Sequence, residues 1–450
     1  MKKNKYEIDM CNGTLMDKLI SFAIPLMLSG ILQLMFNAVD IIVVGRFSGS
    51  QSLAAVGSTT ALINVFTNLF IGISLGANVL AARYYALEKS KEMSETVHTA
   101  IAFALISGVG MAVIGLLMAK PALELMGTPD DVIAKSTLYM RIYFCGMPFF
   151  MLYNYGAAIL RAVGDTKRPL IFLLISGVIN AILNLFLVIQ FHLDVAGVGI
   201  ATVISQLISC ILVLRCLYCS ESSYQFRPEK LNIRSRYLRQ IFEVGIPAGI
   251  QSTVINLSNA MLQSSVNSFG SISMAGYTAA NNIFGFLYVS VNSVTQACMS
   301  FTSQNYGVKK WKRMDKVLRN CILLSVVVSL ILGGGSYLFG PELLKIYTSD
   351  PKVIQCGMEI LLYTTVTYFM CGLMDLFPGA LRGMGYSAIP MLLSIIGTVG
   401  TRIVWIFMIF PRHRSLDVLF ISYPASWLIT IILQVICYFF VRKRIHNPLP

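Results

Sequence analysis

Residues 17–46 read DKLISFAIPLMLSGILQLMFNAVDIIVVGR, and this stretch decides the class of fold. It is long enough to cross a bilayer as a helix, since a membrane-spanning helix needs about 20 mainly apolar residues. Pro25 lies a third of the way along it, and Asp40 lies inside its apolar run. A carboxylate within a membrane is costly, and such residues usually serve ion or substrate binding. Asp40 is therefore the first candidate functional residue.

The composition extends the membrane interpretation to the whole chain. Of the 450 residues, 56% are hydrophobic and 12% are charged, and the mean hydropathy is +0.71. Soluble domains usually contain about 25% charged residues. The pattern predicts an all-α integral membrane protein with twelve transmembrane helices. The predicted spans are residues 18–45, 52–85, 94–118, 132–160, 169–190, 196–218, 239–267, 274–306, 316–339, 353–381, 388–410 and 416–441.

The net charge of +14 is explained by where the basic residues lie in the predicted topology. Most of the 35 Lys and Arg residues fall in the two tails and in the even-numbered connections between spans, which the positive-inside rule places in the cytoplasm. Both termini are then cytoplasmic, and the basic balance reflects anionic lipid rather than a nucleic-acid partner. The ten cysteines include one CxxC pair, Cys216 and Cys219, without a second pair or a histidine at ligand spacing, so no metal site or other cofactor is expected.

The chain repeats itself at an offset of about 221 residues. The matched landmarks are Pro25 with Pro247, Asn37 with Asn259, Tyr85 with Tyr306, Arg161 with Arg382, and Pro169 with Pro390. Six spans in each half give a parallel repeat of two lobes, which in transporters commonly enclose a central cavity. The predicted division is an amino-terminal lobe of residues 1–218, a cytoplasmic linker of residues 219–238 and a carboxy-terminal lobe of residues 239–450.

Pro25 and Pro247 interrupt the first predicted helix of each lobe, because proline removes one backbone hydrogen bond. Each is either a hinge or a static kink. Gln33 and Asn37 stand seven and three residues before Asp40, so all three side chains can face one cavity, although Gln33 is equally suited to hold helices together.

Four motifs are recognisable as those of a known family. They are IPLMLSGILQLMFNAVD at 24–40, AAILRAVGDTKRP at 157–169, AGVGIATVISQ at 196–206 and GALRGMGYSAIP at 379–390. On these the chain resembles the multidrug and toxic compound extrusion (MATE) family. The resemblance implies a secondary antiporter of the plasma membrane, not an enzyme, that exports amphipathic, often cationic compounds in exchange for protons or sodium ions. A monomer working by alternating access is expected.

The resemblance also implies a site. Asp40 matches the family's coupling acid on the first span, and Thr202 matches a threonine on the sixth. Asn180 and Asn184 lie four residues apart, and hence on one face of the fifth span. Several relatives carry an aspartate where this chain has Asn184, so the lobe holds one acid instead of two. This departure favours proton coupling, with sodium bound by Asp40, Asn180, Asn184 and Thr202 as the alternative. Tyr139 on the fourth span is expected near Asp40.

The second lobe departs from the family's other coupling site, whose acids are replaced by Ile255 and Cys371. One acid remains a turn further along, at Asp375, and the repeat aligns it with Asn154. Asp375 either attracts a cationic substrate or pairs with Arg402 on the next span.

Two other functions were weighed against export. A flippase for lipid-linked oligosaccharides needs several basic side chains in its cavity, whereas Arg141 and Arg402 are the only Lys or Arg residues more than four residues from an end of a predicted span. A membrane-embedded enzyme needs clustered Asp, His or Cys residues within a span, and no such cluster is present in the sequence. The sequence does not specify the compounds carried.

Overall fold

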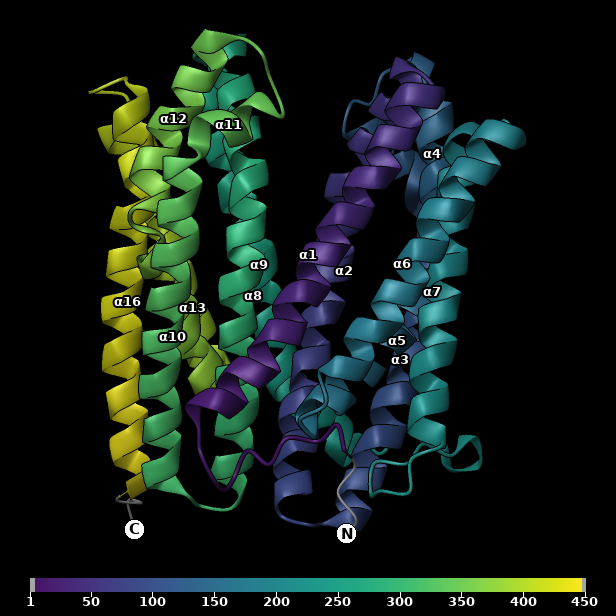
Figure 1. The fold of residues 1–450 in the computed structure, drawn as a ribbon, viewed down its shortest axis with the longest axis vertical. Coiled ribbons are helices and arrows are strands. Elements are labelled where there is room, and N and C mark those ends of the chain that lie inside the picture. Colours follow the sequence, from purple (N-terminus) through teal and green to yellow (C-terminus); the bar gives the residue numbers. More distant parts are fainter. Residues whose placement is uncertain (1–4, 447–450) are drawn as a thin grey trace. The chain divides into compact units, whose positions relative to one another are not determined.

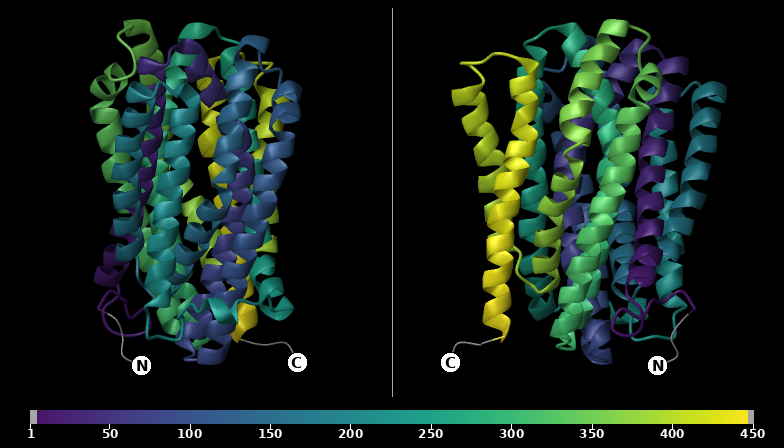
Figure 2. Two further views of the ribbon diagram at one scale, coloured as in Figure 1. Left: turned by 90° about the vertical axis from the view of Figure 1, so that its right-hand side faces the viewer. Right: turned by 60° about the vertical axis from the view of Figure 1, so that its left-hand side comes forward.

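A computed structural model describes residues 5–446. The first and last four residues, the ends of the two predicted cytoplasmic tails, lie outside the described part. All regular structure in residues 5–446 is helical, and this range contains no strand (Figures 1 and 2). The predicted all-α class is confirmed.

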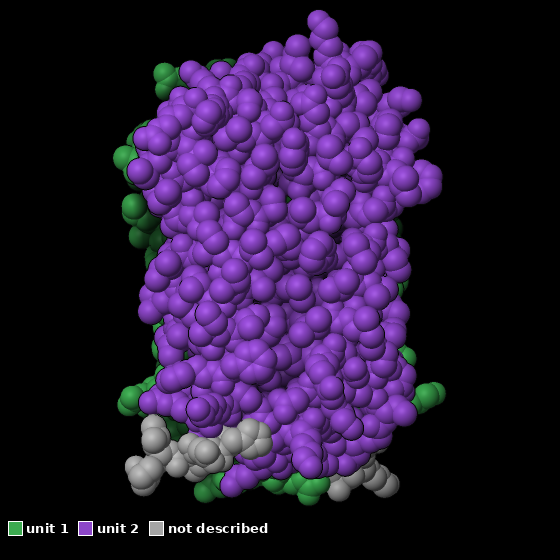
Figure 3. Space-filling model, turned by 90° about the vertical axis from the view of Figure 1, so that its left-hand side faces the viewer, with its two compact units in different colours: residues 1–9, 28–246 green, residues 10–27, 247–450 purple. Residues whose placement is uncertain are grey.

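The chain divides into two compact units, which Figure 3 shows in different colours. Unit 1 comprises residues up to 9 and residues 28–246, and unit 2 comprises residues 10–27 and the chain from 247 onward. The first half of the chain contains α1 (Met16–Phe47), α2 (Ser50–Ala86), α3 (Ser90–Leu125), α4 (Asp130–Cys145), α5 (Met147–Ala162), α6 (Lys167–Leu185), η1 (Phe186–Gln190) and α7 (Asp194–Tyr218). The second half contains η2 (Pro228–Lys230), α8 (Ser235–Asn267), α9 (Ser271–Gly307), α10 (Trp311–Leu338), α11 (Gly340–Lys345), α12 (Pro351–Thr365), α13 (Tyr368–Gly383), α14 (Ala388–Ser394), η3 (Ile395–Gly400), α15 (Thr401–Val404), η4 (Trp405–Ile409) and α16 (Leu416–His446).

Eight helical segments of the described residues are long and apolar enough to cross a membrane, and the pair α12 and α13, bent by 45°, makes a ninth. The other three predicted spans are the pair α4 and α5, broken at Gly146, and the helices α8 and α9. α8 and α9 carry many serine, threonine, asparagine and glutamine side chains, which lowers their hydropathy.

The observed units differ from the predicted lobes because α1 and α8 each belong to both units. α1 passes from unit 2 to unit 1 after Met27, and α8 passes from unit 1 to unit 2 after Ile246. Both transitions lie within three residues of the helix prolines, Pro25 and Pro247. A proline removes one rung of the hydrogen-bond ladder, so the helix on its two sides can pack in different surroundings. The hinge role of the two prolines remains a prediction.

The segment predicted as a linker, residues 219–238, packs within unit 1. Tyr224 and Phe226 are buried, and the backbone N–H of Arg227 donates to Nε2 of His98 on α3 at 3.0 Å. The backbone N–H of Arg234 donates to the Thr99 hydroxyl at 3.2 Å. Because its side chains and backbone are held by α3, this connection is a structured part of unit 1.

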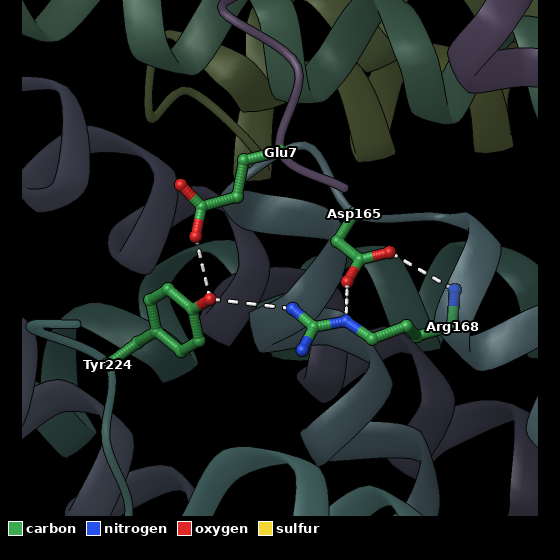
Figure 4. A network of polar contacts seen from close by, with 4 residues as sticks. All are labelled: Glu7, Asp165, Arg168 and Tyr224. Carbon is green, nitrogen blue, oxygen red and sulfur yellow. Dashed lines mark hydrogen bonds and ion pairs between the residues drawn. The ribbon is translucent and has the colours of Figure 1, made fainter. Parts of the chain in front are cut away.

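The amino-terminal tail is also anchored in unit 1, through Glu7 (Figure 4). Tyr224 and Tyr85 each donate their hydroxyl to the Glu7 carboxylate at 2.7 Å. Arg168 approaches the Tyr224 hydroxyl at 3.4 Å and forms an ion pair with Asp165. Burial raises the pKa of Tyr224 and that of Asp165, with Arg168 opposing the rise at Asp165, so Tyr224 stays protonated as the donor to Glu7.

The next residues of the tail are anchored in unit 2 by basic side chains. Arg313 donates to the carbonyls of Met10, Asn12 and Gly13 at 2.9–3.1 Å, and Lys310 donates to the carbonyl of Cys11 at 3.0 Å. The repeat aligns Lys310 with Lys89. Each unit therefore holds a different part of the tail near the end of its second helix.

Candidate functional site

Asp40 lies on the part of α1 that belongs to unit 1, where its side chain is 9% exposed. Asn184 of α6 donates an amide N–H to Oδ1 of Asp40, and the same Nδ2 also donates to Oδ1 of Asn180 at 3.2 Å. Asn180 and Asn184 are both buried. The predicted common face of the fifth span is thus the face that meets Asp40.

A glycine allows α1 and α6 to approach each other at this point. A Cβ atom on Gly177 would lie 1.8 Å from the ring of Phe36, far inside the contact distance. Phe36 precedes Asp40 by one helical turn, and Gly177 precedes Asn184 by about two turns. The ring of Phe36 occupies the space of the missing side chain, which brings the Asp40 carboxylate within reach of Asn184.

Two further helices of unit 1 complete the surroundings of Asp40. The Thr202 hydroxyl of α7 faces the Asp40 carboxylate and also donates to the carbonyl of Val198 at 3.0 Å. Tyr139 and Tyr143 of α4 interact electrostatically with Asp40, and their ring centroids lie 6.3 Å apart. Gln206 of α7 hydrogen-bonds the Tyr143 hydroxyl. Tyr143, Gln206 and Gly177 were not predicted, although Gln206 stands four residues after Thr202 and so on the same face.

No cation compensates the charge of Asp40 within residues 5–446. No lysine, arginine or histidine of this range forms an ion pair with it, and its partners are an amide and a hydroxyl. In the same range the buried Oδ1 of Asn184 accepts no hydrogen bond. An ionised Asp40 is therefore stabilised by donors alone, and a protonated Asp40 has an acceptor at hand in Asn184. The arrangement suits a carboxyl group that gains and loses a proton or a small cation.

Three of the predicted site residues lie outside this network. Gln33 and Asn37 are exposed and form no hydrogen bond with Asp40 in the described part of the chain. Asn37 is turned about 60° around the helix from Asp40, and Gln33 lies about 10 Å along the axis, so α6 contacts neither of them where it meets Asp40. Asn154 donates to the carbonyl of Phe150 in its own helix at 2.8 Å. This is the hydrogen bond that the Asn154 side chain forms in the described structure.

The possible ion pair between Asp375 and Arg402 does not form. Asp375 is half-buried on α13 and interacts electrostatically with Arg382, seven residues further along the same helix. Arg382 in turn donates to Gln251 of α8 at 2.6 Å. Residues seven apart lie on one face of a helix, which explains why Asp375 interacts with Arg382. A role for Asp375 in attracting a cationic substrate remains a prediction.

Arg402 lies on α15, the single α-helical turn between the π-helical segments η3 and η4, and it is 3% exposed. It donates to Oδ1 of Asn259 at 2.7 Å and to the Ser426 hydroxyl at 3.3 Å. Its guanidinium lies 4.7 Å from the ring centroid of Tyr423. This cluster was not predicted. The repeat could have indicated it, because Asn259 and Tyr423 align with Asn37 and Thr202, two predicted site residues of the first half.

Comparison with known proteins gives consistent matches along the chain. The family model MatE matches residues 25–186 and again residues 247–408, which together exceed half of the chain. The "Probable multidrug resistance protein YoeA" of Bacillus subtilis is 29% identical over 432 residues, covering 94% of this chain and 93% of that protein. The "Multidrug export protein MepA" of Staphylococcus aureus is 22% identical over 388 residues, with 84% of each chain covered.

A solved structure shares the fold. The outward-facing conformation of a multidrug resistance MATE family transporter superposes with a TM-score of 0.90 at 19% identity, covering 99% of both chains. The two matches of the family model begin at Pro25 and at Pro247, the prolines that the internal repeat aligns.

Proposed function

The chain belongs to the multidrug and toxic compound extrusion (MATE) family of multi-pass membrane transporters, and we propose that it is a secondary antiporter that exports organic cations in exchange for protons. One observation carries the proposal: Asp40 is a buried intramembrane carboxylate whose partners in the described chain are neutral donors. Such a group avoids a buried uncompensated charge only by binding a proton or a cation.

The exchange uses both states of Asp40. In the ionised state the carboxylate accepts a hydrogen bond from Asn184, and the Thr202 hydroxyl faces it and can turn from the carbonyl of Val198 to donate to it. A proton that binds to Asp40 turns one oxygen into a donor, and the Asn184 amide can then turn to present its oxygen, which accepts no hydrogen bond within residues 5–446. This rotation breaks the bond from Asn184 to Asn180, so protonation changes how α1 is held against α6. Alternating access would couple this change to opening on either side of the membrane.

Protons are preferred over sodium because of the chemistry around Asp40. A bound sodium ion requires several oxygen ligands, and here the Asn184 N–H group occupies one oxygen of Asp40 and the oxygen of Asn180. The site also supplies one negative charge where an aspartate in place of Asn184 would supply two. Sodium at Asp40, Asn180, Asn184 and Thr202 remains the alternative coupling ion and would require the Asn184 amide to turn.

The cargo and the setting complete the proposal. Asp375 would attract the positive charge of the substrate in unit 2, and the multidrug relatives support compounds of varied shape. The protein would act as a monomer in the cytoplasmic membrane with both termini inside, with no nucleic-acid partner and no cofactor. A lipid-linked oligosaccharide flippase is less suited, because Arg141 is exposed and donates to the carbonyl of Leu116 at 3.2 Å, and Arg402 is held by neutral partners within unit 2.

The test is transport of tetraphenylphosphonium in everted membrane vesicles under an imposed pH gradient or an imposed sodium gradient. Wild type is expected to respond to the pH gradient, and Asp40→Asn is expected to fall to the level of vesicles that lack the protein. Asn154→Ala is the control, because Asn154 bonds only within its own helix in the described structure. Full activity of Asp40→Asn would overturn the coupling role, and a response of wild type to sodium alone would overturn the choice of proton.

A further inference from the structure

Arg402 is a permanent positive charge inside a membrane-spanning segment. The apolar segment Ala388–Ile409 carries it, and its side chain is 3% exposed. An arginine keeps its proton under all physiological conditions, so it cannot become neutral as a carboxylate or a lysine can. A buried guanidinium must therefore be compensated by an anion or by neutral hydrogen-bond partners alone.

The partners of Arg402 in the described chain are all neutral. They come from two elements of unit 2: Asn259 of α8, and Ser426 and Tyr423 of α16. The Tyr423 hydroxyl lies 2.8 Å from the hydroxyl of Tyr277 on α9. No carboxylate in residues 5–446 forms an ion pair with Arg402, and Asp375, the acid predicted as its partner, interacts with Arg382.

The cluster leaves donors available for an anion. Asn259 uses its Oδ1 to accept from Arg402, and its amide N–H groups donate no hydrogen bond within the described residues. Between Tyr277 and Tyr423 one hydroxyl donates to the other, so one O–H of the pair remains a donor. Asn259 and Tyr423 are half-buried, in contrast to Arg402, and so give access to the cluster. A guanidinium beside a primary amide and a phenol presents donors that match the two oxygens of a carboxylate.

We propose that Arg402, with Asn259 and Tyr423, forms the site that binds a carboxylate group of the exported compound. The proposal rests on the proposed export function and names the residues that recognise this group. A carboxylate bound there supplies the anionic partner of Arg402 that the described residues do not.

The experiment uses two dyes that differ at one group. Rhodamine 110 carries a free carboxylate, and rhodamine 123 is its methyl ester. Vesicles containing wild type, Arg402→Gln or Arg402→Lys are assayed with both dyes under the same gradient. The ratio of rhodamine 110 to rhodamine 123 transport is expected to fall at least tenfold in Arg402→Gln and to recover in part in Arg402→Lys. Arg141→Gln, which removes an exposed arginine well inside another predicted span, is the matched control and should keep the wild-type ratio.

The remaining outcomes separate the two proposals. An equal loss for both dyes in Arg402→Gln, or an unchanged ratio, would show that Arg402 holds helices together and would overturn the carboxylate site. Transport of rhodamine 123 that depends on chloride in wild type and loses that dependence in Arg402→Gln would assign a chloride site instead. If wild type exports neither dye nor tetraphenylphosphonium, the export function fails, and binding of rhodamine 110 to the purified protein then decides the carboxylate site by itself.

Discussion

Unit 1 buries the carboxylate of Asp40, which lies on the first helix of the first half of the chain, whereas unit 2 buries the guanidinium of Arg402, which lies on the fifth span of the second half. The two surroundings correspond through the repeat. Thr202 beside Asp40 aligns with Tyr423 beside Arg402, and Asn37 aligns with Asn259. At the position of Asp40 the second half offers Met261 or Leu262. One scaffold thus holds opposite charges at related places.

The difference lies in what each charge needs. A proton can neutralise a carboxylate and then leave, which suits a coupling site that alternates between two states. A guanidinium cannot be neutralised in this way, and in the proposed site an anionic group of the substrate compensates it. We therefore expect unit 1 to set the ion dependence of transport and unit 2 to set the selectivity for substrates.

The largest expected effect comes from Asn184→Asp. A second carboxylate against Asp40 cannot be ionised together with the first unless a cation is bound, so the pair either shares a proton or binds sodium. Transport of tetraphenylphosphonium under a sodium gradient alone should rise at least tenfold over wild type. Asn154→Asp is the control, because Asn154 bonds within its own helix. Equal sodium responses in the two variants would contradict the role of Asn184.

The next prediction concerns the close packing of α1 against α6. In unit 1 the contact depends on Gly177, while the aligned residue of unit 2, Thr398, shares a hydrogen bond of 3.0 Å with Thr430. Gly177→Ala places a methyl group in the ring of Phe36 and is expected to cost about 1–3 kcal/mol in stability. It should lower proton-driven transport about tenfold, because Asp40 moves away from Asn184.

The double variant Gly177→Ala with Phe36→Ala restores the space and should recover part of both losses. Thr398→Ala should cost about 1 kcal/mol, the typical value for one hydrogen bond, without changing the ion dependence. The measurements are thermal unfolding in detergent and vesicle transport. A Gly177→Ala protein as stable and active as wild type would show that the α1–α6 distance does not control the site.

The sequence predicts the helical spans, the repeat and part of the Asp40 site. The features that it does not predict have physical causes. Helical spans and the repeat are visible because hydropathy and register are local properties. Asn180 and Asn184 were placed correctly on one face, since spacing of four residues determines a helix face. The transitions after Met27 and Ile246 were missed because they depend on contacts between segments far apart in the sequence. From the sequence, only Arg402 was considered as an ion-pair partner of Asp375, whereas the structure shows an electrostatic interaction with Arg382.

A smaller effect compares how the two units hold the tail. Unit 1 binds the Glu7 carboxylate through two phenols, and unit 2 binds backbone carbonyls through Arg313. Glu7→Gln removes the charge from two hydrogen bonds that lie partly buried, so thermal unfolding should show a loss of about 1–2 kcal/mol. Arg313→Gln should cost less, since most of its bonds are exposed. Arg239→Gln, which breaks an exposed ion pair with Glu243, should leave stability unchanged.

The smallest expected effects come from removing the hydroxyls of Thr202 and Tyr423, which the repeat aligns. Thr202→Val removes a donor that faces Asp40 and keeps the shape of the side chain, so the ionised state of Asp40 loses one of its two stabilising partners. Proton-driven transport should fall two- to fivefold, about 0.5–1 kcal/mol in the affinity of the site. Tyr423→Phe removes a hydroxyl beside Arg402 and keeps the ring that stacks on the guanidinium. It should leave the response to the pH gradient unchanged and lower the rhodamine 110 to rhodamine 123 ratio about twofold. If each variant altered ion dependence and dye selectivity alike, the two units would not divide these tasks, and the opposite charges would serve one shared site.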